Sequence, residues 1–242
     1  MDKPGKFISP DFNPSLTHPA WLTRNRLLRA IRQLIPQLQG RMMDFGCGSK
    51  PYKELFSVDE YIGVDFPSEG HSHAGEQIDV FYDGHHLPFP DAHFDSVFSS
   101  EVFEHIFNLP EILREIQRVM KPGARILITC PFAICEHEVP NDYARYTSFA
   151  MKDMLEKNGF IVLLQDKTGN AMETIWQLRI TYWHLHVVSK FRKIPVLRSA
   201  LRLTIYTGFN LLALLCSRIF PTRKDLYLNN IILAEKKREG IS

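Results

Sequence analysis

The sequence has few cysteines and no long apolar run near its start. Its 242 residues include four cysteines, which is too few for a disulfide scaffold and fits a reducing cytosol. The first fourteen residues contain two lysines but no apolar run behind them, so we expect no signal peptide. A composition of 45% hydrophobic and 23% charged residues excludes disordered and low-complexity classes. We therefore expect one globular domain of generous size, or one domain with an insertion.

Acidic residues are missing from one long stretch. Between residues 174 and 224 there is no Asp or Glu, whereas nine Lys and Arg occur there. The rest of the chain has 20 basic and 27 acidic residues, so an acidic body carries a basic, aromatic-rich C-terminal portion.

Short apolar runs alternate with helical patterns along most of the chain. The apolar periodicity predicts strands at 41–45, 61–66, 78–82, 94–99, 124–129, 160–164 and 227–234. It predicts helices at 21–38, 108–120, 147–157, 171–191 and 196–219, with Asn108 as the N-cap of the second. This alternation is typical of an α/β fold with a mostly parallel sheet and helices on both faces.

Polar residues and glycines follow four successive predicted strands. Gly46 and Gly48 follow the first, but the third glycine of a dinucleotide-binding fingerprint is missing. Asp65 ends the second strand, about twenty residues after the glycines, where a carboxylate can accept ribose hydroxyls. Asp83-Gly84 and Ser99-Ser100-Glu101 follow the next two strands. Each of these residues alone fits a turn or a cap, but together they indicate a ligand site at the carboxyl edge of the sheet.

The series DFGCGS, YIGVDF, DGHHLPFPDAHFDSV, SSEVFEHI and LREIQRVMKPGARILIT resembles class I S-adenosylmethionine-dependent methyltransferases. The resemblance covers residues 40–168 and the last strand, and it is to the small-molecule subgroup that includes quinone-biosynthesis enzymes. It implies a seven-stranded, Rossmann-like methyltransferase sheet whose last strand is antiparallel beside strand five.

The resemblance also implies a role for each matching residue. The segment Asp44, Gly46, Cys47 and Gly48 would surround the methionine part of the cofactor. Asp65 would bind the ribose, Phe66 would pack on the adenine, and Asp83 with Gly84 would lie at the adenine amino group. Ser99, Ser100 and Glu101 would line the methyl-transfer side.

A general base is needed only if the acceptor must lose a proton. Candidates are His105 and the cluster Glu136-His137-Glu138, and we expect the catalytic side chains to be His137, His105 and Glu101. The segment EHEVPNDYARYT resembles one in bacterial methyltransferases of cell-surface polysaccharide pathways. There Asp142, Tyr143, Arg145 and Tyr146 would bind the substrate. The alternative is a polar loop that caps the following helix.

We expect no metal site. His71, His73, His85, His86 and His93 lack paired ligand spacing on one element, and Cys130 fits a buried strand.

The predicted domain organisation is an N-terminal arm (1–18), a methyltransferase domain (19–170 plus 225–238) and a helical, basic and apolar insertion (171–224). The uncharged run 203–217 is fifteen residues, and a spanning helix needs about twenty. The flanking arginines and aromatics instead suggest an anionic membrane surface as partner. A cap over the substrate cleft and a homodimer contact are the alternatives.

These patterns together predict methyl transfer from S-adenosylmethionine to a small-molecule or lipid-linked acceptor, with a saccharide as one such acceptor. The expected location is the cytosol, free or peripheral to the inner face of the membrane. An RNA methyltransferase is one alternative, but the long aliphatic run makes a nucleic-acid partner the weaker choice. A non-catalytic, cofactor-binding and membrane-associated protein is the other.

Overall fold

A computed structural model describes residues 8–67, 76–191 and 193–238. The chain divides into two compact units. The first contains Arg32–Asp166 and the chain from Asn230 onward, and the second contains Ile8–Ile31 and Lys167–Asn229. Each unit is built by its own contacts. His71 and His73, which the sequence analysis considered as metal ligands and set aside, lie outside the described residues.

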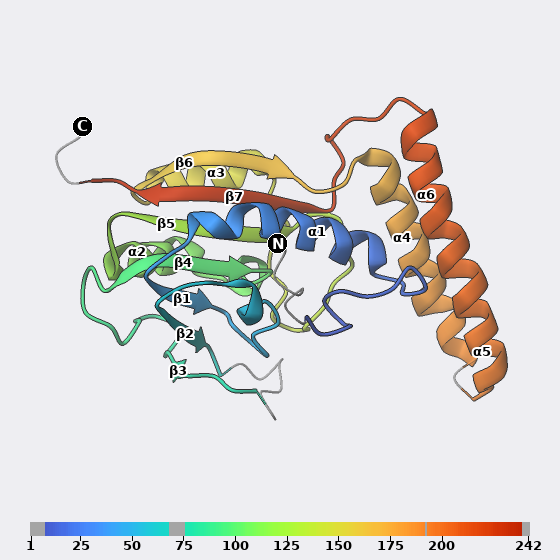
Figure 1. Cartoon of the computed structure of the whole chain (residues 1–242), viewed down its shortest axis with the longest axis horizontal. Helices are drawn as coiled ribbons and strands as arrows, with labels where there is room; N and C mark the ends of the chain where they lie inside the picture. Colours follow the sequence, from blue (N-terminus) through green and yellow to red (C-terminus); the bar gives the residue numbers. More distant parts are fainter. Residues whose placement is uncertain (1–7, 68–75, 192, 239–242) are drawn as a thin grey trace, which may run out of the picture. The chain divides into compact units, whose positions relative to one another are not determined.

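The first unit is built on a seven-stranded sheet (Figure 1). Its strand order is β3-β2-β1-β4-β5-β7-β6. The strands are β1 (Arg41–Phe45), β2 (Glu60–Asp65), β3 (Val80–Phe81), β4 (Phe94–Ser100), β5 (Met120–Pro131), β6 (Phe160–Lys167) and β7 (Asn229–Lys236).

The sheet is mixed rather than wholly parallel. Strand β1 pairs in parallel with β2 and β4, β2 with β3, and β4 with β5. Strand β7 runs antiparallel to β6 (Figure 1). The amide of Lys237 donates to the carbonyl of Gly159 at one end of this pair, and the amide of Thr168 donates to the carbonyl of Asn229 at the other. The seven-stranded methyltransferase sheet predicted from the sequence is confirmed, with β7 inserted between β5 and β6.

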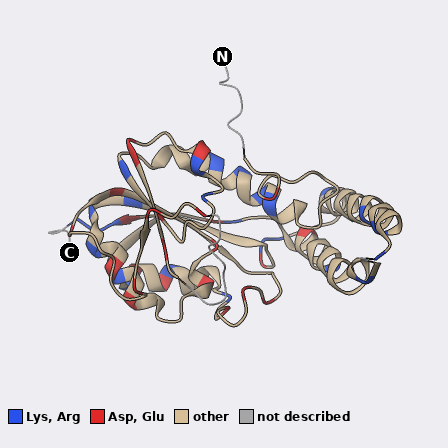
Figure 2. Ribbon diagram, turned by 90° about the horizontal axis from the view of Figure 1, so that it is seen from below, with Lys and Arg blue, Asp and Glu red and all other residues tan. Residues whose placement is uncertain are grey.

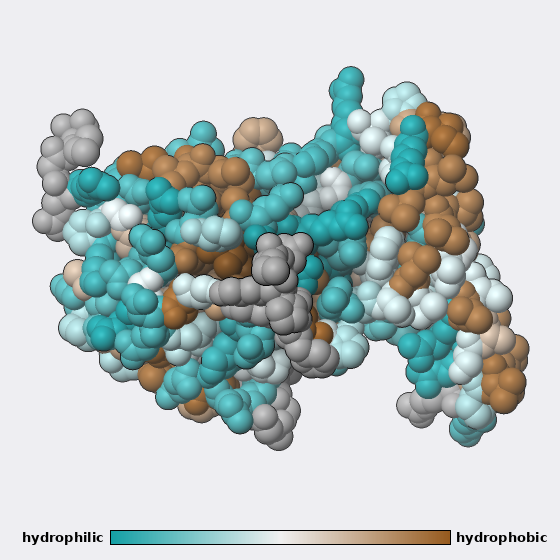
Figure 3. Space-filling model, viewed as in Figure 1, coloured by the Kyte–Doolittle hydropathy of each residue, from teal (hydrophilic) through white to brown (hydrophobic). Residues whose placement is uncertain are grey.

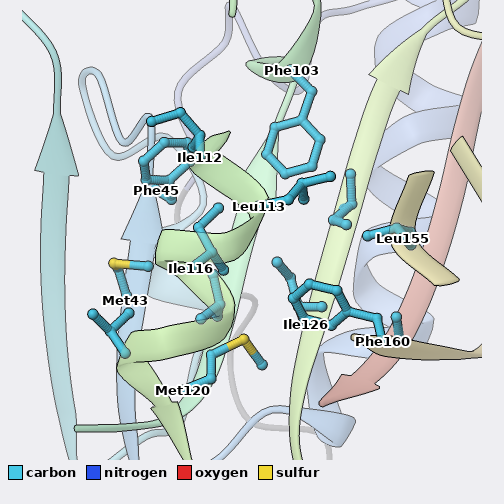
Figure 4. Close-up of a cluster of buried hydrophobic side chains, with 14 of the residues drawn as sticks. Met43, Phe45, Phe103, Ile112, Leu113, Ile116, Met120, Ile126, Leu155 and Phe160 are labelled. Atoms are coloured by element: carbon cyan, nitrogen blue, oxygen red, sulfur yellow. The ribbon is translucent and has the colours of Figure 1, made fainter. Parts of the chain in front are cut away.

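Helices α2 (Leu109–Val119) and α3 (Ser148–Lys157) flank the sheet. Apolar residues recur on one side of α2 and are fully buried, since this side meets the sheet. The core lies here (Figure 4). It includes Met43 and Phe45 from β1, Ile112, Leu113 and Ile116 from α2, Ile126 from β5, and Leu155 and Phe160 from α3 and β6.

The strand order places a crevice at one edge of the sheet. The chain moves outward from β1 to β2 and β3, then crosses back to β4 on the other side of β1. Loops on the two sides of this switch point diverge, which opens a space at the carboxyl ends of the strands. The predicted site residues lie along these loops.

The second unit is a helical hairpin joined by an N-terminal segment. Its helices are α1 (Trp21–Leu34, to Ile31 in this unit), α4 (Ala171–His186), and the continuous helix formed by α5 (Pro195–Leu201), the π-helical η5 (Arg202–Tyr206) and α6 (Thr207–Ile219). A small core of Leu22, Ile180, Val188, Tyr206 and Ala213 holds the unit together.

The two compact units differ from the predicted domain organisation in one respect, because residues 8–31 group with the helical hairpin and not with the sheet. The amide of Gln177 donates to the carbonyl of Pro19 (2.8 Å), and the amide of Asn210 donates to that of Leu16 (2.7 Å). Arg26 forms an ion pair with the buried Glu173. These hydrogen bonds and this ion pair join segments that are more than 140 residues apart in sequence.

Candidate active site

A cavity of about 650 Å³ lies at the carboxyl edge of the sheet. The loops after β1, β2, β3 and β4 and the segment after β5 all contribute to its wall. The sequence-predicted residues that line it are Gly46, Gly48, Asp65, Phe66, Asp83, Gly84, Glu101, His105 and Tyr143.

The charges on the wall of this cavity have one sign. Four carboxylates line it, those of Asp65, Asp83, Glu101 and Glu138, and no Lys or Arg is among its described lining residues. Such a wall favours a cationic or hydroxyl-bearing ligand and disfavours a phosphate.

The glycine loop after β1 needs glycine at both positions. Gly46 has a φ of +72°, and a Cβ there would overlap the side chain of Val102. Gly48 has a φ of +44°, and its amide donates to Oδ2 of Asp65 (2.7 Å). The left-handed backbone therefore brings the loop against the end of β2.

Asp65 and Phe66 present a carboxylate and an aromatic ring side by side. Oδ1 of Asp65 accepts from the amide of Phe66 (2.8 Å), which fixes the carboxylate at the cavity wall. The ring of Phe66 is 40% exposed and lies 5.7 Å from that of Tyr82. A Cβ at Gly84 would lie 2.9 Å from the Phe66 ring, so Gly84 leaves room for it.

Asp83 has a structural role as well as a place at the cavity. Its Oδ1 accepts from the amides of His85 (2.8 Å) and His86 (2.6 Å), and these two donors lower the pKa of the carboxyl. The carboxylate is therefore ionised and held in place.

Two residues of the glycine motif are not among the lining residues of the cavity. Asp44 is buried, burial raises the pKa of its carboxyl to about 7, and the hydroxyl of Tyr61 donates to it. Cys47 is also buried, and its thiol pKa is raised for the same reason. Both are enclosed by protein in this structure, so their contact with the methionine part of a cofactor stays a prediction.

The residues at the end of β4 differ in whether they line the cavity. Ser99 is buried, with no hydrogen-bond partner for its hydroxyl among the described residues, and the hydroxyls of Ser100 and Thr129 are 2.8 Å apart. Neither serine lines the cavity. Glu101 does line it; its φ is +58°, and its carboxylate accepts from the Thr129 hydroxyl (2.9 Å). Glu101 thus lines the cavity with its backbone in a strained, left-handed conformation.

The predicted base candidates His105 and His137 lie together. Their ring centres are 4.7 Å apart, and both rings face the buried carboxylate of Glu104. His105 lines the cavity, and His137 is not among the lining residues. Glu104 and Asp142 raise the pKa of His137.

Asp142 and Arg145 form a brace within the segment after β5. Both terminal nitrogens of the Arg145 guanidinium donate to the Asp142 carboxylate, which lowers the pKa of Asp142 to about 2. Oδ2 of Asp142 also accepts from the amide of His137 (2.9 Å). Neither Asp142 nor Arg145 lines the cavity, so both position His137 in this structure.

The two tyrosines of this segment differ. Tyr143 lines the cavity, and its ring lies 5.5 Å from that of Phe107. Tyr146 is half-buried, packs against the core, and is not a lining residue. The alternative interpretation of this segment as a helix cap is confirmed for Thr147, whose hydroxyl accepts from the amide of Ala150.

Several lining residues have no signal in the sequence that we recognised. Asn108 is the N-cap residue of α2 as predicted, but its side chain makes no cap bond and donates instead to Oε2 of Glu111 (2.8 Å) and to the carbonyl of Gly84 (3.3 Å). The others come from loops whose fold cannot be read from periodicity: Val102, Ile106, Phe107, Pro140 and Asn141, together with Tyr82 and His85.

Residues 43–128 match a family model described as a methyltransferase domain. The chain is 33% identical over 103 residues to 2-phytyl-1,4-naphtoquinone methyltransferase of Synechococcus elongatus, covering 36% of this chain and 44% of that protein. It is 24% identical over 160 residues to malonyl-[acyl-carrier protein] O-methyltransferase of Erwinia pyrifoliae, covering 64% and 60%. The chain therefore spans less than two thirds of the length of either relative.

The fold is shared with solved methyltransferases. Phosphoethanolamine N-methyltransferase 2 of Haemonchus contortus, in complex with S-adenosyl-L-methionine, aligns with a TM-score of 0.53 at 17% identity, covering 96% of this chain and 61% of that one. The family-model match marks residues 43–128 as a methyltransferase domain, and the Rossmann-like fold is shared with this solved methyltransferase.

Proposed function

We propose that the protein transfers a methyl group from S-adenosylmethionine to a small-molecule acceptor. The observation that carries this proposal is the methyltransferase-domain cavity, with four carboxylates and no described Lys or Arg on its wall. A dinucleotide needs a site for its pyrophosphate, which this wall would repel. A sulfonium cation, two ribose hydroxyls and an amino group suit it instead.

The residues present fit this cofactor. Asp65 would accept the ribose hydroxyls, Phe66 would pack on the adenine, and Asp83 would lie near its amino group. The backbone of Gly46 and Gly48, which no Cβ obstructs, would lie along the methionine part. When bound, the sulfonium supplies an electrophilic methyl group, and the protein has to hold the acceptor in line with it.

The acceptor side of the cavity holds the groups that can take a proton. Glu101, His105 and Glu138 all line it, and an acceptor hydroxyl would need such a group. The relatives named above act on a phytyl naphthoquinone and on a malonyl-carrier conjugate by their names. This supports a small acceptor, and we propose that it is lipid-linked.

We further propose that the helical hairpin of the second unit binds an anionic membrane surface. Helix α4 buries Ile180 but leaves Ile175, Tyr182 and Leu185 about half exposed. Helix α6 likewise exposes an apolar stripe, and Figure 3 shows hydrophobic residues gathered there. The stripe consists of Leu211, Leu212, Leu215 and Ile219.

Charge supports a lipid surface as the occupant of this face. No acidic residue occurs between 174 and 224, and Lys and Arg mark the hairpin in Figure 2. Basic residues beside exposed apolar side chains are typical of helices that lie on anionic lipid.

The long helix of the hairpin lies where the sequence predicts a helix, over 196–219, but it is longer than the uncharged run on which the argument against a membrane span rested. The uncharged run is fifteen residues, but Pro195–Ile219 forms 25 residues of continuous helix. By length and composition this helix could cross a membrane, and 17% of its most apolar window is buried. Core helices of soluble proteins pass the same test but are mostly buried, so we propose contact with lipid for this helix.

Calorimetric titration of the purified protein tests the cofactor assignment. We expect S-adenosylhomocysteine to bind with one site per chain and NAD to show no measurable binding. The product lacks the methyl group and so reports binding without turnover. Tight binding of NAD, or no binding of S-adenosylhomocysteine, would contradict the proposed function.

A further inference from the structure

Three potential ligand atoms converge beside the cavity. Glu104, His105 and His137 each supply one of them, and these atoms all lie within 4.8 Å of one another. Glu104 and His105 belong to the short helix η3 (Phe103–His105) after β4, and His137 lies in the segment after β5. The fold therefore brings together residues more than thirty positions apart in the sequence.

The carboxylate at the centre of this cluster is fully buried. Glu104 has no exposed surface, and its Oε1 has no hydrogen-bond partner among the described residues. Its distances to Nε2 of His105 (3.5 Å) and of His137 (3.8 Å) exceed those of N–H···O hydrogen bonds. A buried carboxylate oxygen without a partner is costly, so some positive group is needed there.

The other nitrogen of each imidazole has acceptors for neighbours. Nδ1 of His105 lies 2.7 Å from the carbonyl of Asn141. Nδ1 of His137 lies 3.3 Å from both the carbonyl of Cys135 and the carboxylate of Asp142, with a guanidinium nitrogen of Arg145 farther away at 3.5 Å. Because carbonyls and carboxylates only accept, each Nδ1 carries the proton. With a cation bound, each Nε2 would present its lone pair to the metal while Nδ1–H is held by these acceptors, the arrangement that orients metal-binding histidines.

We propose that Glu104, His105 and His137 bind a divalent cation of the zinc class. Zinc–ligand bonds of about 2.0–2.1 Å imply ligand atoms roughly 3.3 Å apart in a tetrahedral site, close to the 3.5 and 3.8 Å found here. Two imidazoles and one carboxylate are a zinc ligand set that leaves a fourth position open. This proposal departs from the expectation of no metal site, which considered paired ligand spacing within single elements, because these ligands come from two separate loops.

The role of this cation in methyl transfer rests on the proposed function, whereas the metal site itself does not. His105 lines the cavity, and Oε2 of Glu138, another lining residue, is 3.7 Å from its Nε2. The open position would thus face the acceptor, where a cation lowers the pKa of a hydroxyl group. The inference narrows the acceptor to one with an ionisable oxygen.

Cobalt titration of the chelator-treated full-length protein tests the site without any methyl transfer. We expect one Co²⁺ per chain, visible absorption bands of a tetrahedral N/O site, and displacement of Co²⁺ by Zn²⁺. His105→Ala and His137→Ala should each weaken Co²⁺ binding at least about 100-fold. His86→Ala is the matched control, since His86 is exposed beside Glu115, and it should bind as the unaltered protein does.

Two results would overturn the metal site. One is the absence of cobalt bands and of stoichiometric binding in the unaltered protein, which would leave the cluster as a proton-sharing group. The other is binding that persists in the double variant His105→Ala/His137→Ala with an unchanged thermal midpoint. Because S-adenosylhomocysteine titration is measured separately, failure of the metal site leaves the proposed function standing or falling on its own.

Discussion

At the scale of single residues, the ion pair of Asp142 and Arg145 sets the position of His137. The Asp142 carboxylate is 3% exposed, and it accepts from the guanidinium and from the amide of His137. Arg145 also donates to the carbonyl of Cys135 (3.2 Å). One cation thus holds both ends of the loop that carries the histidine.

Removing that cation should destabilise the protein. Arg145→Ala leaves a buried, ionised carboxylate without its partner, and we expect a loss of about 2 kcal/mol in the free energy of unfolding at pH 7. Urea denaturation at several pH values measures it. The folded pKa of Asp142 is depressed to about 2, so its stabilisation is present above about pH 4 and is lost as the pH falls. The difference between the two proteins should therefore shrink towards pH 3.

The control for this change is Lys157→Ala. Lys157 pairs with Asp153 on α3, and both side chains are largely exposed. Exposed pairs contribute little, so this variant should lose less than about 0.5 kcal/mol. Equal losses in the two variants, or a difference that does not depend on pH, would show that Asp142 is not held as described.

At the scale of elements, the strands and their carboxyl ends could be predicted from the sequence. Apolar runs that end in glycine or a carboxylate placed β1, β2 and β4 within one or two residues of their observed bounds. Asp65 and Glu101 reached the cavity as predicted, because both stand just where a strand ends.

The direction of side chains within a strand could not be predicted as well. Asp44 of β1 does not line the cavity, whereas the next residue, the equally buried Phe45, does. Successive side chains of a strand alternate between its faces, so an error of one residue exchanges wall and interior. The family pattern alone does not state which face each residue occupies.

The loops carry the largest gap between prediction and structure. Asn108 fits the pattern of an N-cap but binds the Gly84 carbonyl, and Glu104 fits a buried helix position but faces two histidines. Both depend on contacts between segments distant in sequence, which no local period encodes.

At the scale of the whole molecule, charge is divided unevenly. Lys and Arg occur between residues 174 and 224 without any Asp or Glu, while the rest of the chain has an excess of acidic residues. Each Lys or Arg near anionic lipid contributes on the order of 1 kcal/mol, and salt screens it. We therefore expect the protein to co-sediment with phosphatidylserine-containing vesicles at low salt and much less with phosphatidylcholine vesicles.

Two sets of changes separate the charge from the apolar face. Replacing Arg198, Arg202 and Arg218 by Gln should reduce binding to anionic vesicles, and Leu211→Glu with Leu215→Glu should abolish it. The control is Phe149→Glu on α3, which places the same charge at an 81% exposed apolar position outside the hairpin. Equal, negligible sedimentation with both vesicle types would withdraw the membrane proposal.

The central claim is that the acidic cavity holds S-adenosylmethionine through the carboxylate at the end of β2. Calorimetry with Asp65→Ala measures it most directly, and Asp65→Asn is the matched variant, since its amide oxygen can still accept from Gly48. We predict that Asp65→Ala weakens the binding of S-adenosylhomocysteine by about 2–4 kcal/mol, the loss of two charge-assisted hydrogen bonds, and that Asp65→Asn lies between it and the unaltered protein. An unchanged affinity in a folded Asp65→Ala protein would contradict the account.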